Sequence, residues 1–406
     1  MISVERISTV DVRNNNRYSV FRTICRHKAA SVSQISKETE LSHTAVKASI
    51  KDLLSSNLIL QAGEGPSSGG RPPDLYSLNL DQVFTIGVQV TRGEMLAAVV
   101  DLAGNIRTEE RQPIEDGSPN NVAGLVGQMA EKLGGEFIRN RRNIFALGVA
   151  VLGIVDRRLG SIVYDADFHW ERVPFLELLR KKTELPVSII EESNASAIAE
   201  REWGKGNLFT NFVFLHFTRG IGAGVIQQGR LLEGTNGSLG EVGHMSINFD
   251  EPKCYCGNIG CWAQYASTEN LIDKLKKKLK KRVLDLKQVV HLVEQRNQDV
   301  LAEFDRFCFY HAIGITNIIN ILDPQAIFIS GRVKYFGEYY LKRITDFIFE
   351  RALPSHLERC SIEFSGLPEP YPPLLGAAFF SLENRLLGKD SGFSLFARTQ
   401  VSKEYA

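Results

Sequence analysis

A histidine and three cysteines stand close together in the second half of the chain, at the spacing H-x9-C-x-C-x4-C. They are His244, Cys254, Cys256 and Cys261. One imidazole nitrogen and three thiolates suit a closed tetrahedral zinc site, and the glycines among them let a short loop wrap the ion. Because a catalytic zinc keeps one position open for water, four protein ligands predict one structural Zn²⁺ per chain. Two alternatives are cysteines that are close by accident and a disulfide.

The N-terminal sequence argues against the disulfide. Residues 1–9 contain no apolar segment of the length that a secretory signal needs. We therefore expect a reducing compartment, where clustered cysteines favour a metal over a disulfide. No apolar run reaches the roughly 20 residues that span a bilayer. We expect a cytoplasmic protein without membrane insertion.

Residues 16–60 predict three helices, over about 17–27, from an N-cap at Ser33 to about 39, and over 43–55. The tight turn before the third helix gives a helix-turn-helix plan, whose second helix would lie in the major groove of DNA. The residues that would face DNA are Ser42, His43, Thr44, Lys47 and Lys51. The short polar groups can reach base edges, and the lysines suit phosphates.

Two short strands, over 58–61 and 75–78, flank a Gly/Ser-rich tip and predict a wing. Arg71, between glycine and proline, is extended and positive, which suits a narrow minor groove. Residues 1–80 carry ten Lys and Arg against seven Asp and Glu, whereas the whole chain is nearly neutral at +1. These features predict a double-stranded DNA operator as a partner. A protein-interaction unit followed by a linker is the alternative.

The remaining sequence alternates strands and helices, which predicts an α/β body with two lobes around a cleft. The 406 residues allow two or three domains. The expected strands are 84–90, 95–101, 144–152, 187–191, 212–217, 222–227 and 326–330, and the expected helices are 121–140, 194–203 and 301–321.

The run Gly237-x-x-Gly240-Glu241-Val242-Gly243-His244, followed by Cys254-Tyr255-Cys256-Gly257-Asn258-Ile259-Gly260-Cys261, resembles the ROK family of repressors, open reading frames and sugar kinases. The resemblance covers essentially the whole chain. The winged module and its Gly-Gly-Arg-Pro segment resemble the repressor branch, which includes regulators of glucose and N-acetylglucosamine uptake genes.

The resemblance implies a winged helix-turn-helix joined to an actin-like, sugar-kinase-like body with a structural zinc site. The domains that we expect are a DNA-binding domain over 1–80, lobe 1 over 81–195, lobe 2 over 196–385 with the zinc loop 244–261 and an oligomerisation surface, and a tail over 386–406. A homodimer or homotetramer would match a palindromic operator.

The ATP site that the family's kinases need is altered in this sequence. Their first phosphate loop reads Asp-x-Gly-Gly-Thr after the opening strand. Here Gln89 replaces the aspartate, Thr91 and Arg92 replace the glycines, and Gly93 replaces the threonine. A phosphate needs close backbone approach and a carboxylate that organises the metal. We therefore expect no kinase activity.

The sugar site that the resemblance implies is retained in part. The family's Asn-Asp pair, which contacts the hexose, corresponds to Glu191 and Glu192, and glutamate is one methylene longer than aspartate. Glu241 and His244 match the family's E-x-G-H sugar contacts. A further family glutamate is replaced by Ala263, which removes a carboxylate that would accept hydroxyl hydrogen bonds.

These departures predict a sugar, sugar phosphate or sugar derivative other than plain glucose as effector. Solvated cleft carboxylates without a ligand, and control by a protein partner, are the alternatives. An aromatic and acidic loop could supply further sugar contacts, with core packing as the alternative for its tryptophan: Tyr164, Asp165, Asp167, Phe168 and Trp170. The sequence thus predicts a DNA-binding repressor of carbohydrate uptake or catabolism genes. An active sugar kinase with an appended domain is the rival from another class.

Overall fold

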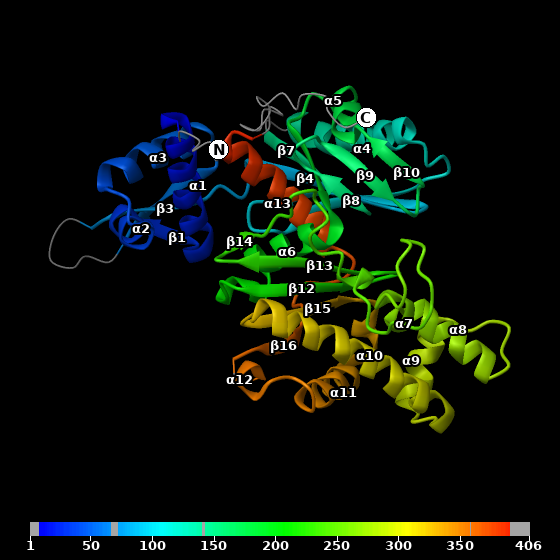
Figure 1. Ribbon diagram of the computed structural model, residues 1–406. Helices are drawn as coiled ribbons and strands as arrows, with labels where there is room; N and C mark the ends of the chain where they lie inside the picture. Colours follow the sequence, from blue (N-terminus) through cyan, green and yellow to red (C-terminus); the bar gives the residue numbers. More distant parts are fainter. Residues whose placement is uncertain (1–7, 66–71, 140–142, 358, 390–406) are drawn as a thin grey trace, which may run out of the picture. The chain divides into compact units, whose positions relative to one another are not determined.

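The computed structural model describes residues 8–65, 72–139, 143–357 and 359–389 (Figure 1). The chain divides into two compact units. Unit 1 extends to Glu192 and resumes at Leu374, and unit 2 comprises Ser193–Pro373. Each unit has its own hydrophobic core and its own five-stranded sheet.

Three helices and a small sheet form the N-terminal part of unit 1. The helices are α1 (Thr9–His27), α2 (Val32–Thr39) and α3 (His43–Ser55). The sheet has the order β1-β3-β2 and consists of β1 (Ala29–Ser31), β2 (Ile59–Glu64) and β3 (Asp74–Leu78). Val20, Ile35, Val46 and Leu53 are buried, so all three helices contribute to one small core.

Two helix starts differ from the sequence prediction. α1 begins at Thr9 rather than near Arg17, because Ser8 and Asp11 form a capping box. α2 begins two residues early because Ser31, not Ser33, accepts the capping hydrogen bond from Gln34 N. Ser42 caps α3 as predicted and accepts from Ala45 N at 3.2 Å.

The large sheet of unit 1 has the order β11-β7-β4-β5-β6. β4, β7 and β11 run parallel, while β5 and β6 continue the sheet in antiparallel fashion. Their bounds are β4 (Val83–Thr91), β5 (Glu94–Asp101), β6 (Ile106–Pro113), β7 (Asn143–Val151) and β11 (Val187–Glu191). The helices α4 (Pro119–Arg139) and α5 (Phe175–Arg180) bury their apolar faces in the same core.

A second, three-stranded sheet follows β7. It has the order β10-β9-β8 and consists of β8 (Ile154–Asp156), β9 (Ser161–Asp165) and β10 (Trp170–Val173). The aromatic and acidic residues that the sequence singled out therefore lie at the end of β9, in the turn after it and at the start of β10.

The helix α13 (Pro372–Leu387) packs onto the large sheet of unit 1, although the sequence assigned 196–385 to the second lobe. Gly87 and Gly148 pair across β4 and β7 and let the helix backbone approach. A Cβ at Gly148 would lie 1.8 Å from the carbonyl oxygen of Ala377, a distance that no side chain can occupy. Within the described residues, the segment 374–389 therefore belongs with the first lobe, which corrects the predicted boundary.

The sheet of unit 2 has the order β14-β13-β12-β15-β16. Its strands are β12 (Phe212–Phe217), β13 (Ile221–Gln227), β14 (Arg230–Leu231), β15 (Ala326–Gly331) and β16 (Ser361–Phe364). α6 (Glu192–Trp203) contributes Ala197 to one small core beside this sheet. The larger core contains residues of α7 (Ala263–Ala266), α8 (Thr268–Lys278), α9 (Leu286–Glu294), α10 (Gln298–Leu322) and α11 (Gly337–Phe349). A short α12 (Pro354–Leu357) precedes β16.

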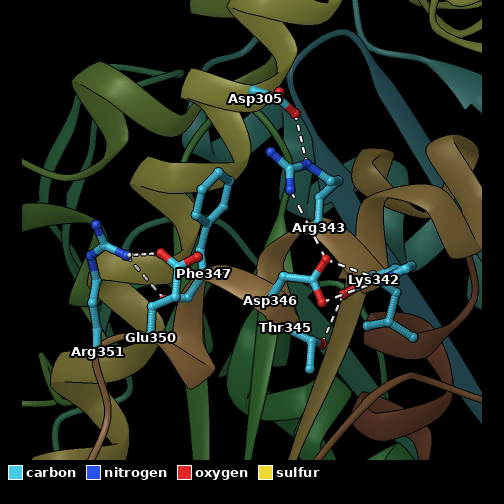
Figure 2. Close-up of polar contacts among 9 residues, drawn as sticks. Asp305, Lys342, Arg343, Thr345, Asp346, Phe347, Glu350 and Arg351 are labelled. Atoms are coloured by element: carbon cyan, nitrogen blue, oxygen red, sulfur yellow. Dashed lines mark hydrogen bonds and ion pairs between the residues drawn. The ribbon is translucent and has the colours of Figure 1, made fainter.

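Polar contacts join α10 to α11 and brace α11 along its surface, as Figure 2 shows. Arg343 donates to Asp305 on α10 at 2.8 Å, and Lys342 donates to Asp346 one turn along α11 at 3.1 Å. The guanidinium of Arg351 lies over the ring of Phe309, 4.4 Å from its centroid. The helix pair is thus fixed by cation–aromatic and ionic contacts as well as by its core.

None of the helices in the described part of the chain combines the length and the apolar character that crossing a membrane requires.

Candidate functional site

The predicted metal ligands come together in unit 2. One ligand atom from each of His244, Cys254, Cys256 and Cys261 lies within 4.8 Å of the others. Cys256 Sγ and Cys261 Sγ are 3.6 Å apart, and Cys254 Sγ lies 3.7 Å from Nδ1 of His244. A four-coordinate ion bound at about 2.3 Å by sulfur has S···S edges of roughly 3.8 Å, so the donor set fits a tetrahedral metal ion. The cluster can hold a metal.

Two glycines set the segment that leads into this cluster. Gly240, with φ +103°, packs so tightly on β13 that a Cβ would lie 2.0 Å from the carbonyl oxygen of Ala223. Gly243 meets the carbonyl oxygen of Ile221 in the same way, at 2.5 Å. The backbone of the strand therefore fixes the short 3-10 turn Val242–His244, and with it the positions of Glu241 and His244.

The two ring nitrogens of His244 have different neighbours. Nδ1 faces the cysteine sulfurs, whereas Nε2 lies 3.9 Å from a Glu241 oxygen and 3.3 Å from the hydroxyl of Tyr255. Burial lowers the pKa of His244, which favours the neutral imidazole that binds metals. Burial also raises the pKa of Glu241. Glu241 and His244 thus form one polar group at the edge of the metal cluster.

The other two predicted effector residues, Glu191 and Glu192, lie at the end of β11 in unit 1. Glu192 is only 7% exposed. Burial raises its pKa to about 8, and the like charges of Glu191, Asp167 and Asp165 add to this effect, while a hydrogen bond from Gln89 opposes it. At neutral pH the Glu192 carboxyl is therefore mostly protonated and can donate a hydrogen bond as well as accept one.

Two of the departures from the kinase pattern thus touch each other. Gln89, on β4, stands where the family's kinases have an aspartate, and Glu192 stands where they have the shorter carboxylate. The amide of Gln89 hydrogen-bonds the longer Glu192 side chain, whereas an aspartate at 89 would add another like charge to this group. Neither position alone carried a signal for this contact in the sequence.

The turn between β9 and β10 has mixed roles. Asp165 accepts the backbone N–H groups of Asp167 and Phe168 at 2.8 and 3.0 Å, so it forms the turn. Trp170 donates from Nε1 to the carbonyl oxygen of Gly117 at 2.8 Å and stacks on Phe168, which confirms the alternative of core packing. Tyr164 is part-exposed on β9.

A cavity of about 600 Å³ opens beside this turn within unit 1. Its polar lining comes from Arg92 on the β4–β5 turn, Glu115 and Ser118 before α4, and Asp167 and His169 after β9. Arg92 therefore lines a hollow instead of leaving backbone open for a phosphate.

The predicted DNA-facing residues lie on one surface of α3. Ser42, His43, Thr44, Lys47 and Lys51 are all exposed. His43, Lys47 and Lys51 follow each other at intervals of four, and together with Tyr76 of β3 they line a cavity of about 450 Å³. Arg71 lies outside the described residues.

Sequence reasoning missed how α1 is attached to the rest of unit 1. Arg17 donates to the backbone carbonyl groups of Arg385 and Leu386, and Asn14 donates to that of Leu387 at 3.3 Å. These carbonyls end α13, where a helix presents unpaired acceptors and favours a cation.

A second contact beside this one involves Tyr18, whose hydroxyl donates to Glu383 on α13. Burial lowers the pKa of Arg157, which follows β8, to about 10, and the charge of Glu383 opposes this shift. α13 therefore links α1 to the small sheet that carries Asp165.

Residues 85–379 match the profile of the ROK family. The chain is similar to a xylose repressor of Bacillus spizizenii, with 29% identity over 84% of this chain and 88% of that protein. It is also similar to the DNA-binding transcriptional dual regulator NagC of Escherichia coli, with 26% identity over 86% of this chain and 88% of the relative.

Solved structures share the fold. A ROK family transcriptional regulator, described as a homologue of the E. coli MLC protein, superimposes with a TM-score of 0.83 and 21% identity over 94% of this chain and 99% of its own. A ROK family glucokinase from Streptomyces griseus, in complex with glucose and AMPPNP, gives a TM-score of 0.64 and 22% identity over 73% of this chain and 98% of its own. The two-lobed α/β body is therefore that of this fold.

Proposed function

This chain belongs to the ROK family, and from that premise we propose that it is a transcriptional repressor of sugar genes that binds operator DNA and releases it when a sugar binds. The observation that carries the proposal is the exposed face of α3, which is capped at Ser42 and bears Lys47 and Lys51. Curated relatives that match most of its length include proteins named xylose repressor and DNA-binding transcriptional dual regulator.

The proposal assigns DNA recognition to the N-terminal part of unit 1. α2 and α3 act as the helix-turn-helix, and β2 and β3 act as the wing. Ser42, His43 and Thr44 stand at the start of α3, from which recognition helices reach base edges. Arg71 is proposed for the minor groove beside the wing. A dimer would engage two half-sites of a palindrome.

The metal that the proposal assigns to the cluster in unit 2 is zinc. One imidazole and three thiolates are the ligands of structural zinc sites, and the 3.6 Å distance between Cys256 Sγ and Cys261 Sγ fits such a site. When bound, the ion would cross-link the loop and fix the ring of His244. The chain's own part is to orient Nε2 and Glu241 toward a ligand hydroxyl.

The proposed effector is a neutral sugar, with the pentose D-xylose as the first candidate because several relatives are named xylose repressors. We propose Glu241 and His244 of unit 2 as contacts of its hydroxyls and, taken separately, Glu191 and Glu192 of unit 1. A mostly protonated Glu192 next to Gln89 supports this role, since a neutral acid is less costly to bury against an uncharged ligand than a carboxylate is.

The proposed mechanism is linkage between effector and operator. Each ligand favours a different arrangement of the protein, so each weakens binding of the other by the same factor. The contacts of Arg17 and Tyr18 with α13 support a route within unit 1, because they join the DNA-binding helices to the lobe that carries Glu192.

The test begins with DNA that the protein retains from its own genome, followed by fluorescence anisotropy on the selected site. Replacement of Lys47 and Lys51 by alanine should flatten the slope of log K against log salt by about 0.9 for each lysine–phosphate ion pair that the substitutions remove. The matched control is Lys287→Ala, an exposed lysine on α9. A slope that stays the same in the double variant would remove α3 from the interface.

Kinase activity is tested by ADP release with a panel of sugars and Mg²⁺. We expect no turnover above background, because Gln89 and Arg92 occupy the positions of the family's phosphate loop. Robust turnover would make the chain an enzyme with a DNA-binding domain.

A further inference from the structure

Tyr255 lies between two of the ligand cysteines in the sequence. It is neither a metal ligand nor one of the proposed effector contacts. Its side chain is 66% exposed. Even so, its hydroxyl lies 3.3 Å from Nε2 of His244, and its ring packs edge-on against the imidazole with centroids 5.4 Å apart. The hydroxyl thus turns inward to the one histidine nitrogen that does not face the cysteines.

The nitrogen of His244 that binds the metal determines which nitrogen of the ring carries the proton. Nδ1 of His244 faces Cys254 Sγ, so a metal there leaves Nδ1 without a proton and Nε2 with one. Nε2 then donates to the Tyr255 hydroxyl, with the Glu241 carboxylate 3.9 Å from the same nitrogen. A hydroxyl at this place can accept the hydrogen bond that Nε2 donates.

We infer that Tyr255 is an internal competitor that occupies on His244 the place of a sugar hydroxyl and thereby sets the affinity for the effector. This rests on the proposed effector role of His244 and Glu241. A sugar hydroxyl and a tyrosine hydroxyl accept and donate hydrogen bonds in the same way, so both satisfy the same N–H and only one can do so at a time. Because Tyr255 is 66% exposed, little of its surface is packed against the core.

The rival explanation is that Tyr255 only orients His244 for the metal, as outer partners of metal-bound histidines do. Other contacts already hold this histidine. Its carbonyl oxygen accepts from Asn258 Nδ2 at 3.0 Å, and Glu241 stands beside Nε2. The two roles differ in what the variant without the hydroxyl changes, because one affects sugar affinity and the other affects metal affinity.

The test is the variant Tyr255→Phe, which keeps the ring and removes the hydroxyl. The full chain is loaded with zinc and titrated calorimetrically with D-xylose and with N-acetyl-D-glucosamine. Removal of a competing hydrogen bond should tighten the binding of the sugar that binds by about 2- to 10-fold, with zinc content unchanged. The matched control is Tyr335→Phe, which removes the hydroxyl of a similarly exposed tyrosine at 64% and should change neither quantity.

Each outcome decides a different point. Sugar binding by the variant where the native chain shows none supports the inference, as does tighter binding. Equal or weaker sugar binding at full zinc content overturns it, and so does a tenfold loss of zinc affinity, which would assign Tyr255 to the metal. If neither protein binds either sugar while both still bind operator DNA, the effector proposal itself fails and the inference fails with it.

Discussion

Two polar groups of this molecule differ in how the chain assembles them. One is the metal cluster with Glu241 in unit 2, and the other is the acidic group around Glu192 in unit 1. The cluster takes all four ligands from 18 consecutive residues, His244 to Cys261, and its loop is pinned by glycines to one strand. The acidic group combines Gln89 from β4, Asp165 from the end of β9, Asp167 from the turn after it, and Glu191 and Glu192 from β11 and α6.

The difference teaches which kind of site can change its chemistry. A tetrahedral ion tolerates few replacements among its ligands, because each ligand supplies one of four bonds. The acidic group has no such centre, and a change at one position can be answered at another. The amide of Gln89 against the longer Glu192 is one such answer, since it replaces a repulsion between two carboxylates with a hydrogen bond.

The largest effect that separates the two groups should come from Cys256→Ser. Loss of one thiolate leaves three ligands, so the chain should lose at least about tenfold in zinc affinity and unfold at a lower temperature. Metal content by mass spectrometry and thermal unfolding would measure both. Glu192→Gln, which changes the acidic group and no metal ligand, should keep its zinc.

Cys360→Ser is the matched control, because Cys360 is a part-buried cysteine of unit 2 outside the cluster. Full zinc content in Cys256→Ser would refute the ligand assignment and would make the loop a protein-only turn.

The next effect in size concerns the buried acid. Between a pH of about 4.5 and about 8 the folded chain keeps the Glu192 proton that the unfolded chain has released. The contribution of Glu192 to the free energy of unfolding therefore falls as pH rises through this range, by about 1.4 kcal/mol per pH unit. Glu192→Gln cannot lose a proton, so the variant should gain stability relative to the native chain by about 3 kcal/mol between pH 5.5 and pH 8.

Urea unfolding at several pH values would measure this difference. Glu171→Gln, at an exposed position on β10, is the control and should leave the pH slope unchanged. A pH-independent difference between Glu192→Gln and the native chain would show that the Glu192 carboxyl is already ionised in the folded state.

The same contrast explains how much the sequence could predict. The ligand spacing and the Ser42 cap are local patterns, and the structure brings the four ligands together and caps α3 as predicted. The capping box of Ser8 and Asp11 at the start of α1 is also a local pattern, and it could have been found in the sequence. The family match confirms the ROK assignment.

What the sequence could not predict depends on partners that are distant along the chain. In the sequence, Gly87 and Gly148 give no sign of their role. That role depends on the pairing of β4 with β7 and on the packing of α13 against both strands. Arg17 meets the end of α13 some 370 residues away, a contact that no local pattern encodes. The role of Trp170 stayed open for the same reason, because its acceptor, the carbonyl oxygen of Gly117, comes from the loop before α4.

The smallest effect should come from Glu191→Gln. This variant tests whether the charge of Glu191 contributes to the raised pKa of Glu192. Burial is the main cause of the raised pKa of Glu192, and the charge of Glu191 comes second. Removal of that charge should bring the pKa of Glu192 below about 8 but leave it above its ordinary value, since the burial persists. The pH at which the stability gain of Glu192→Gln levels off, measured with and without Glu191→Gln, reports this shift. An unmoved midpoint would mean that water screens the two carboxyls from each other, and Glu191 would then not belong to the group.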